Sequence, residues 1–253
     1  MAADVQLIRH ATLRITYGDT IVLVDPMFSD AAALPPVPDS PFPRRNPIVP
    51  LRVSLDDVLD GVALVLVTHT HRDHWDDAAV KALPKHLTVR CQPSDEEKIR
   101  KDGFERAAAI ETSASEAGIS ITRTGGRHGS GEMAAKMGPV SGFVLKRTGL
   151  PTLYVAGDTI WCPEPQDAIA RHKPDLIVLN SGAAQFNSGG PITMDTDDVI
   201  SVVRAAPDAR ILAVHMNAWN HCVLTRATLG DNLQKANLGR RVTIPDDSEH
   251  VSL

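Results

Sequence analysis

The hydrophobic pattern at the start of the chain predicts a meander of antiparallel strands. Apolar and polar positions alternate through residues 5–17, break at Gly18-Asp19, and resume as an apolar run over residues 21–24. Residues 62–67 form another continuous apolar run, which is typical of a strand covered on both faces. This last run ends directly in a histidine-rich stretch, so those histidines are expected at the end of a buried strand.

Strands and helices alternate along the rest of the chain. The expected strands cover residues 87–91, 119–124, 140–146, 152–155, 176–179, 211–214 and 242–244. The expected helices cover residues 76–83, 165–171, 196–205 and 225–236, with a charged helix behind Pro93 for which Ser94 is the predicted N-cap. Two β-rich halves that each carry helices favour the α/β (α+β) class, with two stacked sheets, helices outside and a single domain over residues 1–253.

Residues 27–50 form a proline-rich segment between the meander and the buried strand. Its prolines are Pro35, Pro36, Pro38, Pro41, Pro43, Pro47 and Pro50. Proline donates no backbone hydrogen bond, so this segment is predicted to run over the surface as a loop. Loops of this length are often functional, and this one is expected to cover the mouth of a site.

Composition and charge narrow the class of protein. The chain has 253 residues, of which 43% are hydrophobic and 23% charged, as in ordinary folded domains. A net charge of −5 provides no cationic field to attract nucleic acid, so a nucleic-acid partner is not expected. No apolar run approaches the ~20 residues that span a bilayer, and the start lacks a basic and apolar leader, so we expect a cytoplasmic protein without a membrane partner.

The cysteines give no sign of thiolate metal binding. Cys91, Cys162 and Cys222 are widely separated and form no Cys-x-x-Cys pair. Reduced thiols are therefore expected.

The chemistry of the chain is concentrated in Thr68-His69-Thr70-His71-Arg72-Asp73-His74. Four potential ligands lie within six residues directly after the buried strand, where side chains can converge. Imidazole and carboxylate groups suit zinc, iron and manganese. Four ionisable groups at the end of a buried strand would be costly unless a metal held them, which favours a metal site over an exposed histidine-rich turn.

The spacing His-x-His-x-Asp-His resembles the signature of the metallo-β-lactamase superfamily. Further ligands of that superfamily match His128 in Gly-Gly-Arg-His-Gly, Asp158 in Val-Ala-Gly-Asp-Thr and His215 in Leu-Ala-Val-His. The resemblance covers essentially the whole chain and implies a four-layer αββα sandwich. It is greatest to the branch of L-ascorbate 6-phosphate lactonase and related predicted metal-dependent hydrolases.

This resemblance implies two divalent metal ions, zinc or manganese, and a division of the ligands between them. One ion takes His69, His71 and His128; the other takes Asp73, His74 and His215; Asp158 bridges the two. Asp73 and Asp158 are then also the expected catalytic residues. A metal-bridging hydroxide would cleave a small ester or lactone, because two ions lower the pKa of water and polarise the scissile bond.

Substrate contacts and orienting residues are predicted from chain position. Arg127, Trp161 and His221 follow strand ends at the expected rim, and Arg127 suits a small, anionic substrate. The candidates for orienting the ligands are Asp25, Thr68 and Thr159. His10 is left outside the predicted site, because this chain reads Arg9-His10 where relatives more often read Gly-His.

Other functions stay open at this stage. A phosphodiesterase or nuclease shares the ligand set, but the chain shows neither a clamp domain nor a basic patch. A mono-iron dioxygenase-like oxidoreductase needs only part of the set, and a non-catalytic metal-binding scaffold would be expected to have lost ligands. The substrate, the metal and the oligomeric state are not determined by the sequence.

Overall fold

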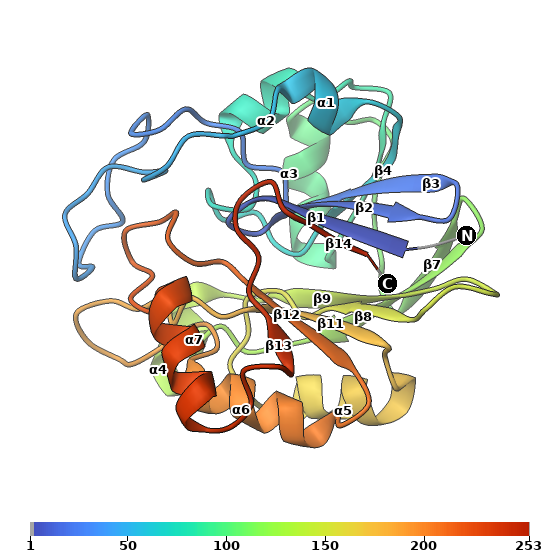
Figure 1. The fold of residues 1–253 in the computed structure, drawn as a ribbon. Helices are drawn as coiled ribbons and strands as arrows, with labels where there is room; N and C mark the ends of the chain where they lie inside the picture. Colours follow the sequence, from blue (N-terminus) through green and yellow to red (C-terminus); the bar gives the residue numbers. More distant parts are fainter. Residues whose placement is uncertain (1–2, 253) are drawn as a thin grey trace.

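Residues 3–252, which the computed structural model describes, form two seven-stranded sheets packed face to face (Figure 1). The first sheet has the order β14-β1-β2-β3-β4-β5-β6 and the second β13-β12-β11-β10-β9-β8-β7. Helices α1, α2 and α3 cover the outer face of the first sheet and α5, α6 and α7 that of the second (Figure 1). The predicted four-layer αββα sandwich is confirmed.

The bounds of the elements follow the hydrophobic pattern closely. The first sheet contains β1 (Ala3–Arg9), β2 (Thr12–Tyr17), β3 (Thr20–Val24), β4 (Val62–Val67), β5 (Thr88–Cys91), β6 (Ala107–Ala109) and β14 (His250–Ser252). The second contains β7 (Ser113–Glu116), β8 (Ile119–Gly125), β9 (Ser141–Lys146), β10 (Leu153–Val155), β11 (Leu176–Asn180), β12 (Arg210–Val214) and β13 (Val242–Thr243). The helices are α1 (Leu55–Leu59), α2 (Asp77–Ala82), η1 (Pro93–Asp95), α3 (Glu96–Lys101), α4 (Gly131–Met137), α5 (Pro163–His172), α6 (Thr196–Ala205) and α7 (Arg226–Lys235).

One prediction about these elements was wrong. Ser94 does not cap a helix, because Pro93–Asp95 forms a 3-10 turn and the α-helix begins after it at Glu96. Pro93 at the first position starts the turn one step early, and Ser94 therefore lies inside it. The short helices α1 and α4 and the edge strands β7 and β14 were not predicted, because they bury few apolar side chains and leave a weak periodic signal.

Apolar side chains fill the space between the sheets and the space beneath each helical layer. Leu7, Ile15, Phe143 and Leu212 belong to the cluster between the sheets, and all are at most 1% exposed. Burying one such side chain contributes about 1.5–3 kcal/mol to stability. Among the described residues, no helix is long and apolar enough to cross a membrane.

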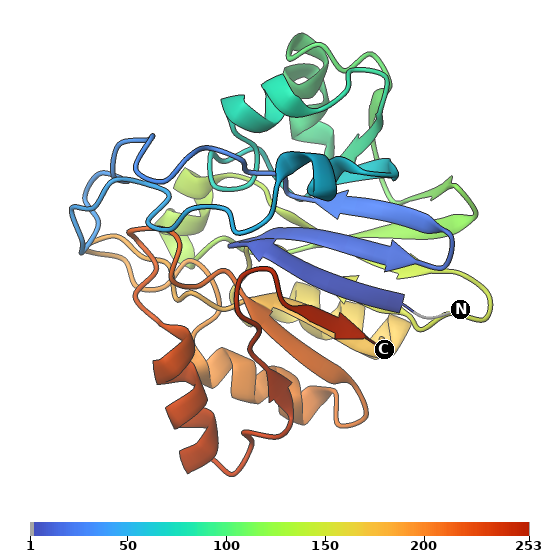
Figure 2. The same ribbon diagram turned by 45° about the horizontal axis from the view of Figure 1, so that its top comes forward.

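The strand directions bring many carboxyl ends to one edge of the sandwich. β3 runs parallel to β4 and antiparallel to β2, and β2 runs antiparallel to β1, so β1, β3 and β4 point the same way. In the second sheet β10, β11 and β12 are parallel. The long loops gather beyond this edge, at the left of Figures 1 and 2. In sheets of this kind, residues that follow strand ends at a shared edge build the site.

The proline-rich segment, residues 27–50, is a loop that is tied down at both ends. The guanidinium of Arg9, which is fully buried, donates to the carbonyl oxygens of Met27 (3.1 Å), Ser29 (2.9 Å) and Val49 (3.0 Å). Burial lowers the pKa of Arg9 to about 10, so the side chain stays charged at neutral pH. Arg9 therefore has a structural role for which a glycine could not substitute.

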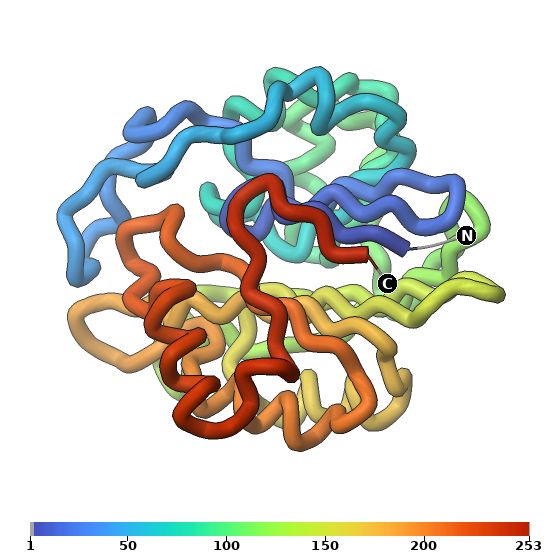
Figure 3. The backbone as a smooth tube through the Cα atoms, in the orientation of Figure 1, coloured from blue at the N-terminus to red at the C-terminus, as the bar shows by residue number. Residues whose placement is uncertain are grey.

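The middle of the proline-rich segment is fastened by a pair of buried asparagines. Asn46 Nδ2 donates to Asn220 Oδ1 (2.7 Å), and the backbone N–H of Asn220 donates to Asn46 Oδ1 (2.9 Å). Asn220 also accepts from the backbone N–H of Val37 (2.9 Å) and donates to Ser40 Oγ and to the carbonyl oxygen of Phe42, both at 2.6 Å. These bonds hold the segment against the loop that follows β12, and Figure 3 shows the two lying side by side.

Candidate metal centre

The predicted ligands all follow strand ends at the shared edge. His69 comes two residues after β4, and Asp73 and His74 lie in the short turn that continues from it. His128 follows β8, Asp158 follows β10 and His215 follows β12 directly. The first sheet therefore supplies one part of the ligand set and the second sheet the other.

One cluster consists of His69, His71 and His128. His69 Nε2 lies 3.0 Å from His71 Nδ1, and the ligand atoms of all three lie within 4.8 Å of one another. Asp158 Oδ2 lies 3.5 Å from His128 Nε2 and 3.9 Å from His69 Nε2. Two ligand atoms that bind one metal at about 2.1 Å are roughly 3.0–3.5 Å apart. The His69–His71 and His128–Asp158 separations fall in this range, and the His69–Asp158 separation is slightly longer.

A second cluster lies beside the first and shares Asp158 with it. His74 Nε2 lies 3.3 Å from His215 Nε2 and 3.8 Å from Asp73 Oδ2. The carboxylate of Asp158 reaches both histidines, with Oδ2 at 3.2 Å from His74 Nε2 and Oδ1 at 3.4 Å from His215 Nε2. The carboxylate of Asp158 therefore lies between the two clusters and contacts histidines of both.

Hydrogen bonds to the outer ring nitrogens fix the orientation of the histidines. His74 donates Nδ1–H to Asp25 Oδ2 (2.8 Å), and His128 donates Nδ1–H to the carbonyl oxygen of Ile192 (2.8 Å). His69 Nδ1 lies 3.2 Å from Thr68 Oγ1, which itself donates to Asp25. These bonds leave the Nε2 lone pairs directed inward, which is how metal-binding histidines are held.

Two further residues, which were not predicted from the sequence, also contact the predicted ligands. His215 Nδ1 lies 3.6 Å from Cys222 Sγ, and Asn180 Nδ2 donates to Asp158 Oδ1 at 2.7 Å. Of the candidates chosen from chain position, Asp25 and Thr68 contact ligands. Thr159 Oγ1 instead accepts from the backbone N–H of Arg127.

Burial and neighbouring charges shift the pKa values of the carboxylates and histidines in the two clusters. Burial alone would raise the pKa of Asp158, but His215, His74 and His128 hold it well below its usual range. Burial lowers the pKa of His69 well below its usual value and also lowers that of His128, so both are neutral at neutral pH. Charged carboxylates and neutral imidazoles are the forms that bind metal. Although burial lowers it, the surrounding carboxylates of Asp158, Asp73 and Asp25 raise the pKa of His74 well above its usual value. The residues present thus fit divalent metal ions by ligand type, ring orientation and spacing.

Comparison with known proteins decides the family. Residues 20–216 match the model of the beta-lactamase superfamily domain. The chain belongs to the beta-lactamase superfamily. Within it, the chain is 36% identical over 249 residues to the UPF0173 protein YddR of Bacillus subtilis, a match that covers 97% of this chain and 98% of that protein. It therefore belongs to the UPF0173 family, and a second relative is the UPF0173 metal-dependent hydrolase Ta0764 of Thermoplasma acidophilum, 28% identical over 71% of this chain and 75% of that protein.

Two solved structures are similar to this chain over nearly their full length. The isothiocyanate hydrolase from Delia radicum gut bacteria is 36% identical, with a TM-score of 0.94 and 98% of each chain covered. A possible metal-dependent hydrolase from Veillonella parvula is 34% identical, with a TM-score of 0.97 and 100% of each chain covered.

A cavity opens onto the predicted ligands. It has a volume of about 270 Å³ and is bounded at its inner end by His71, Asp73 and His128. Its walls are largely apolar: Leu34, Pro35, Pro36, Val37 and Pro38 from the proline-rich segment, together with Met137, Phe186 and Trp219. The proline-rich segment thus forms one wall of the cavity.

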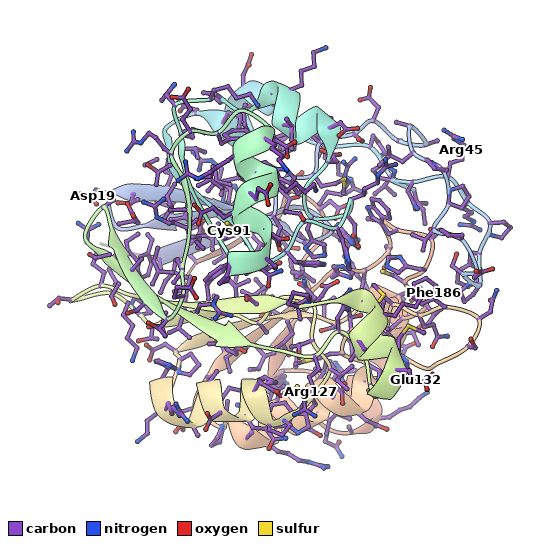
Figure 4. The ribbon with its side chains drawn as sticks, turned by 180° about the vertical axis from the view of Figure 1, so that it is seen from behind. Asp19, Arg45, Cys91, Arg127, Glu132 and Phe186 are labelled. Atoms are coloured by element: carbon purple, nitrogen blue, oxygen red, sulfur yellow. The ribbon has the colours of Figure 1, made fainter. Side chains whose placement is uncertain are left out.

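Of the three residues predicted to contact substrate, only His221 lines the cavity. His221 lines the cavity, with Nε2 3.8 Å from Asp73 Oδ2, and burial lowers its pKa to about 4. Trp161 packs against the cluster under the second sheet and does not line this cavity. Arg127 is half exposed and pairs with Glu164 at 3.0 Å, beside the helical layer (Figure 4). Arg72 lines the cavity instead.

Sequence reasoning missed two residues that belong to this centre. His10 follows β1 and places Nε2 3.3 Å from Asp73 Oδ2. Asn220, next to His221, fixes the cavity wall. The position of His10 at a strand end was a usable signal, whereas nothing in the sequence pairs Asn46 with Asn220.

Proposed function

We propose that this protein is a metal-dependent hydrolase that adds water to the electrophilic carbon of a small molecule with an apolar arm. The first substrate class we propose is the isothiocyanates. The observation that carries this proposal is the cavity of about 270 Å³, which leads from the ligands to an apolar wall. Pockets of this kind select small ligands by apolar contact and orient them with a few polar groups. The likeness to an isothiocyanate hydrolase supports the choice of class.

The reaction balances with water as the only co-reactant. When bound, two divalent ions supply Lewis acidity and lower the pKa of water. The oxygen of water bonds to the central carbon of R–N=C=S and one proton passes to nitrogen, which gives the thiocarbamic acid R–NH–C(=S)–OH. The second proton of water then passes to the same nitrogen as the carbon–nitrogen bond breaks. The products are the amine R–NH₂ and carbonyl sulfide.

The residues of the cavity have separate roles in this proposal. Asp73 and Asp158 hold the ligand set together from its two clusters, and Asp73 also faces the cavity. His221 is neutral at neutral pH and lines the cavity within reach of Asp73, so we assign it a hydrogen bond to the substrate's heteroatom. Trp219 and Phe186 would contact the apolar arm opposite the proline-rich wall.

A small ester or lactone, the class that the resemblance to lactonases implies, is the second substrate class we propose. Its carbonyl carbon accepts the same nucleophile, and the cavity provides the same polar inner end. Zinc or manganese is the proposed metal, with two ions per chain. A long nucleic-acid substrate is disfavoured by the net charge of −5, and the three buried free cysteines suit a cytoplasmic location.

The test is a hydrolysis screen with metal-loaded protein. The panel contains benzyl isothiocyanate, methyl isothiocyanate, phenyl acetate, a γ-lactone and a phosphodiester, and the amine, acid or alcohol released is measured. We expect the greatest kcat/KM for benzyl isothiocyanate, above the methyl compound. Turnover of the phosphodiester alone would overturn the proposal, and turnover of the lactone or ester alone would replace the first class by the second.

Replacing Asn220 with Ala should weaken selection for an apolar arm. The variant loses the hydrogen bonds that hold the wall, and ordering the wall again on binding costs about 1–2 kcal/mol. We expect KM for benzyl isothiocyanate to rise roughly tenfold, and KM for methyl isothiocyanate to change little. Asn187→Ala is the matched control, because this exposed side chain takes no part in holding the wall. An equal rise for both substrates would contradict the role of Asn220.

An anionic substrate should distinguish Arg72 from Arg127. Arg72 lines the cavity, whereas Arg127 pairs with Glu164 away from it. Arg72→Ala should raise KM for an anionic ester roughly fivefold, about 1 kcal/mol, and leave a neutral ester unaffected. Arg127→Ala should affect both esters alike. A selective effect of Arg127→Ala would restore Arg127 as the anion contact.

A further inference from the structure

His10 lies beside Asp73, His74 and His215 but does not belong to the predicted ligand set. It is fully buried, its Nε2 lies 3.3 Å from Asp73 Oδ2, and its ring centroid lies 3.7 Å from that of His215. Its ligand-type atom lies within 4.8 Å of those of Asp73, His74 and His215. His10 is therefore either a further ligand or a residue that orients one.

The backbone of His10 has a positive φ, as does that of His215. His10 has a φ of 62°, and His215 has a φ of 69°. The backbone N–H of His215 donates to the carbonyl oxygen of His10 at 2.9 Å, which joins the two sheets at their shared edge. A left-handed conformation is uncommon for histidine, and such strain is kept where the surroundings impose it, often at functional sites.

The hydrogen bonding of the ring nitrogen Nδ1 distinguishes a metal ligand from a residue that orients a ligand. His69, His74, His128 and His215 each have a partner for Nδ1, and these partners leave Nε2 free to bind metal. Nδ1 of His10 is buried and has no hydrogen-bond partner among residues 3–252. If Nε2 of His10 bound metal, Nδ1 would have to carry a buried, unpaired N–H, which costs about 1–3 kcal/mol. With the proton on Nε2, that donor is satisfied by Asp73.

We propose that His10 is a positioning residue that donates its Nε2–H to Asp73 Oδ2 and so holds Asp73 in the orientation needed to bind metal. This inference rests on the proposed metal centre and not on the substrate. Asp73 lies in the short turn after β4, and its Oδ2 lies within 4.0 Å of histidine nitrogens from His10, His74, His215 and His221. Of these, His10 alone is neither an expected ligand nor part of the cavity lining.

A pair of amide variants tests the proposal. In His10→Gln the side-chain amide reaches the position of the imidazole Nε2, so a donor to Asp73 is kept. In His10→Asn the shorter amide reaches only the position of Nδ1, so the donor is lost. Asparagine is well tolerated at positive φ, and a loss in His10→Asn therefore cannot be attributed to the backbone.

The measurements are metal affinity and the coordination of the bound metal, and neither needs substrate. The metal-free protein and both variants are titrated with Zn²⁺ against a competing chelator, and their Co²⁺ absorption spectra are recorded. We expect the second equivalent of Zn²⁺ to bind about 10–100-fold more weakly to His10→Asn, and within a few-fold of the unchanged protein to His10→Gln. The Co²⁺ spectrum of His10→Gln should match that of the unchanged protein.

Each other outcome overturns the proposal. If both variants bind the second Zn²⁺ weakly and both Co²⁺ spectra show a lower coordination number, His10 is a metal ligand. If neither variant changes affinity beyond a few-fold, His10 is a packing residue. A failure of the hydrolysis screen would leave these results intact, so the two proposals fail independently.

Discussion

Replacing Asp158 with Ala is expected to remove bound metal and to lower kcat/KM by more than about 100-fold. Replacing a group that only orients a ligand already costs 10–100-fold, and Asp158 contacts both clusters directly. Its loss leaves His74 and His215 without the carboxylate between them. Elemental analysis of the purified variant, joined to kinetics on the best substrate of the screen, measures both effects.

Two control variants test whether the loss of metal is specific to Asp158. Asp231→Ala removes an exposed carboxylate on α7 and should leave metal content and activity unchanged. His221→Ala should keep both metals and lose less activity, because His221 lines the cavity without belonging to either cluster. An Asp158→Ala protein that retained two metals per chain would contradict the bridging role.

Removing the metals should lower the melting temperature by about 8–16 °C. Metal that binds the folded state at 1,000 times its Kd adds about 4.1 kcal/mol, and 1 kcal/mol corresponds to about 2–4 °C for a domain of this size. The ligands come from both sheets, so bound metal joins the two halves of the sandwich. Without metal, the anionic carboxylates Asp73 and Asp158 stay buried together.

Calorimetry before and after chelation, with metal loss verified by elemental analysis, measures this shift. Restoring Zn²⁺ should return the original melting temperature. The same chelator added to Asp158→Ala protein should change little, because that variant holds less metal at the start. An unchanged melting temperature in verified metal-free protein would show that the centre adds nothing to stability.

The sequence was sufficient to predict the fold, and the residues predicted as ligands lie together in the structure. Four-layer architecture follows from apolar runs such as residues 62–67, since a strand buried on both faces needs a layer on each side. The stretch of residues 69–74 was found from its own spacing after a buried strand, whereas His128, Asp158 and His215 were found from the resemblance to the superfamily. The structure brings all of these predicted ligands together as two clusters that share Asp158.

What the sequence could not provide depends on long-range geometry. Arg127 is adjacent to His128, yet its side chain pairs with Glu164, because the loop after β8 turns it toward α5. Asn46 and Asn220 are separated by 174 positions, and no pattern connects them. His10 was set aside because of its neighbour Arg9, although Arg9 has its own task in fastening the proline-rich segment.

The fastening of the proline-rich wall has a kinetic consequence. Many hydrolases close a mobile lid over the substrate, and the opening of that lid on the microsecond to millisecond scale often limits turnover. Here Arg9 holds both ends of the wall and Asn220 holds its middle, so we expect the mouth of the cavity to keep its shape through substrate binding and product release. On that expectation product would leave without a gating step, and kcat would report the chemical step itself.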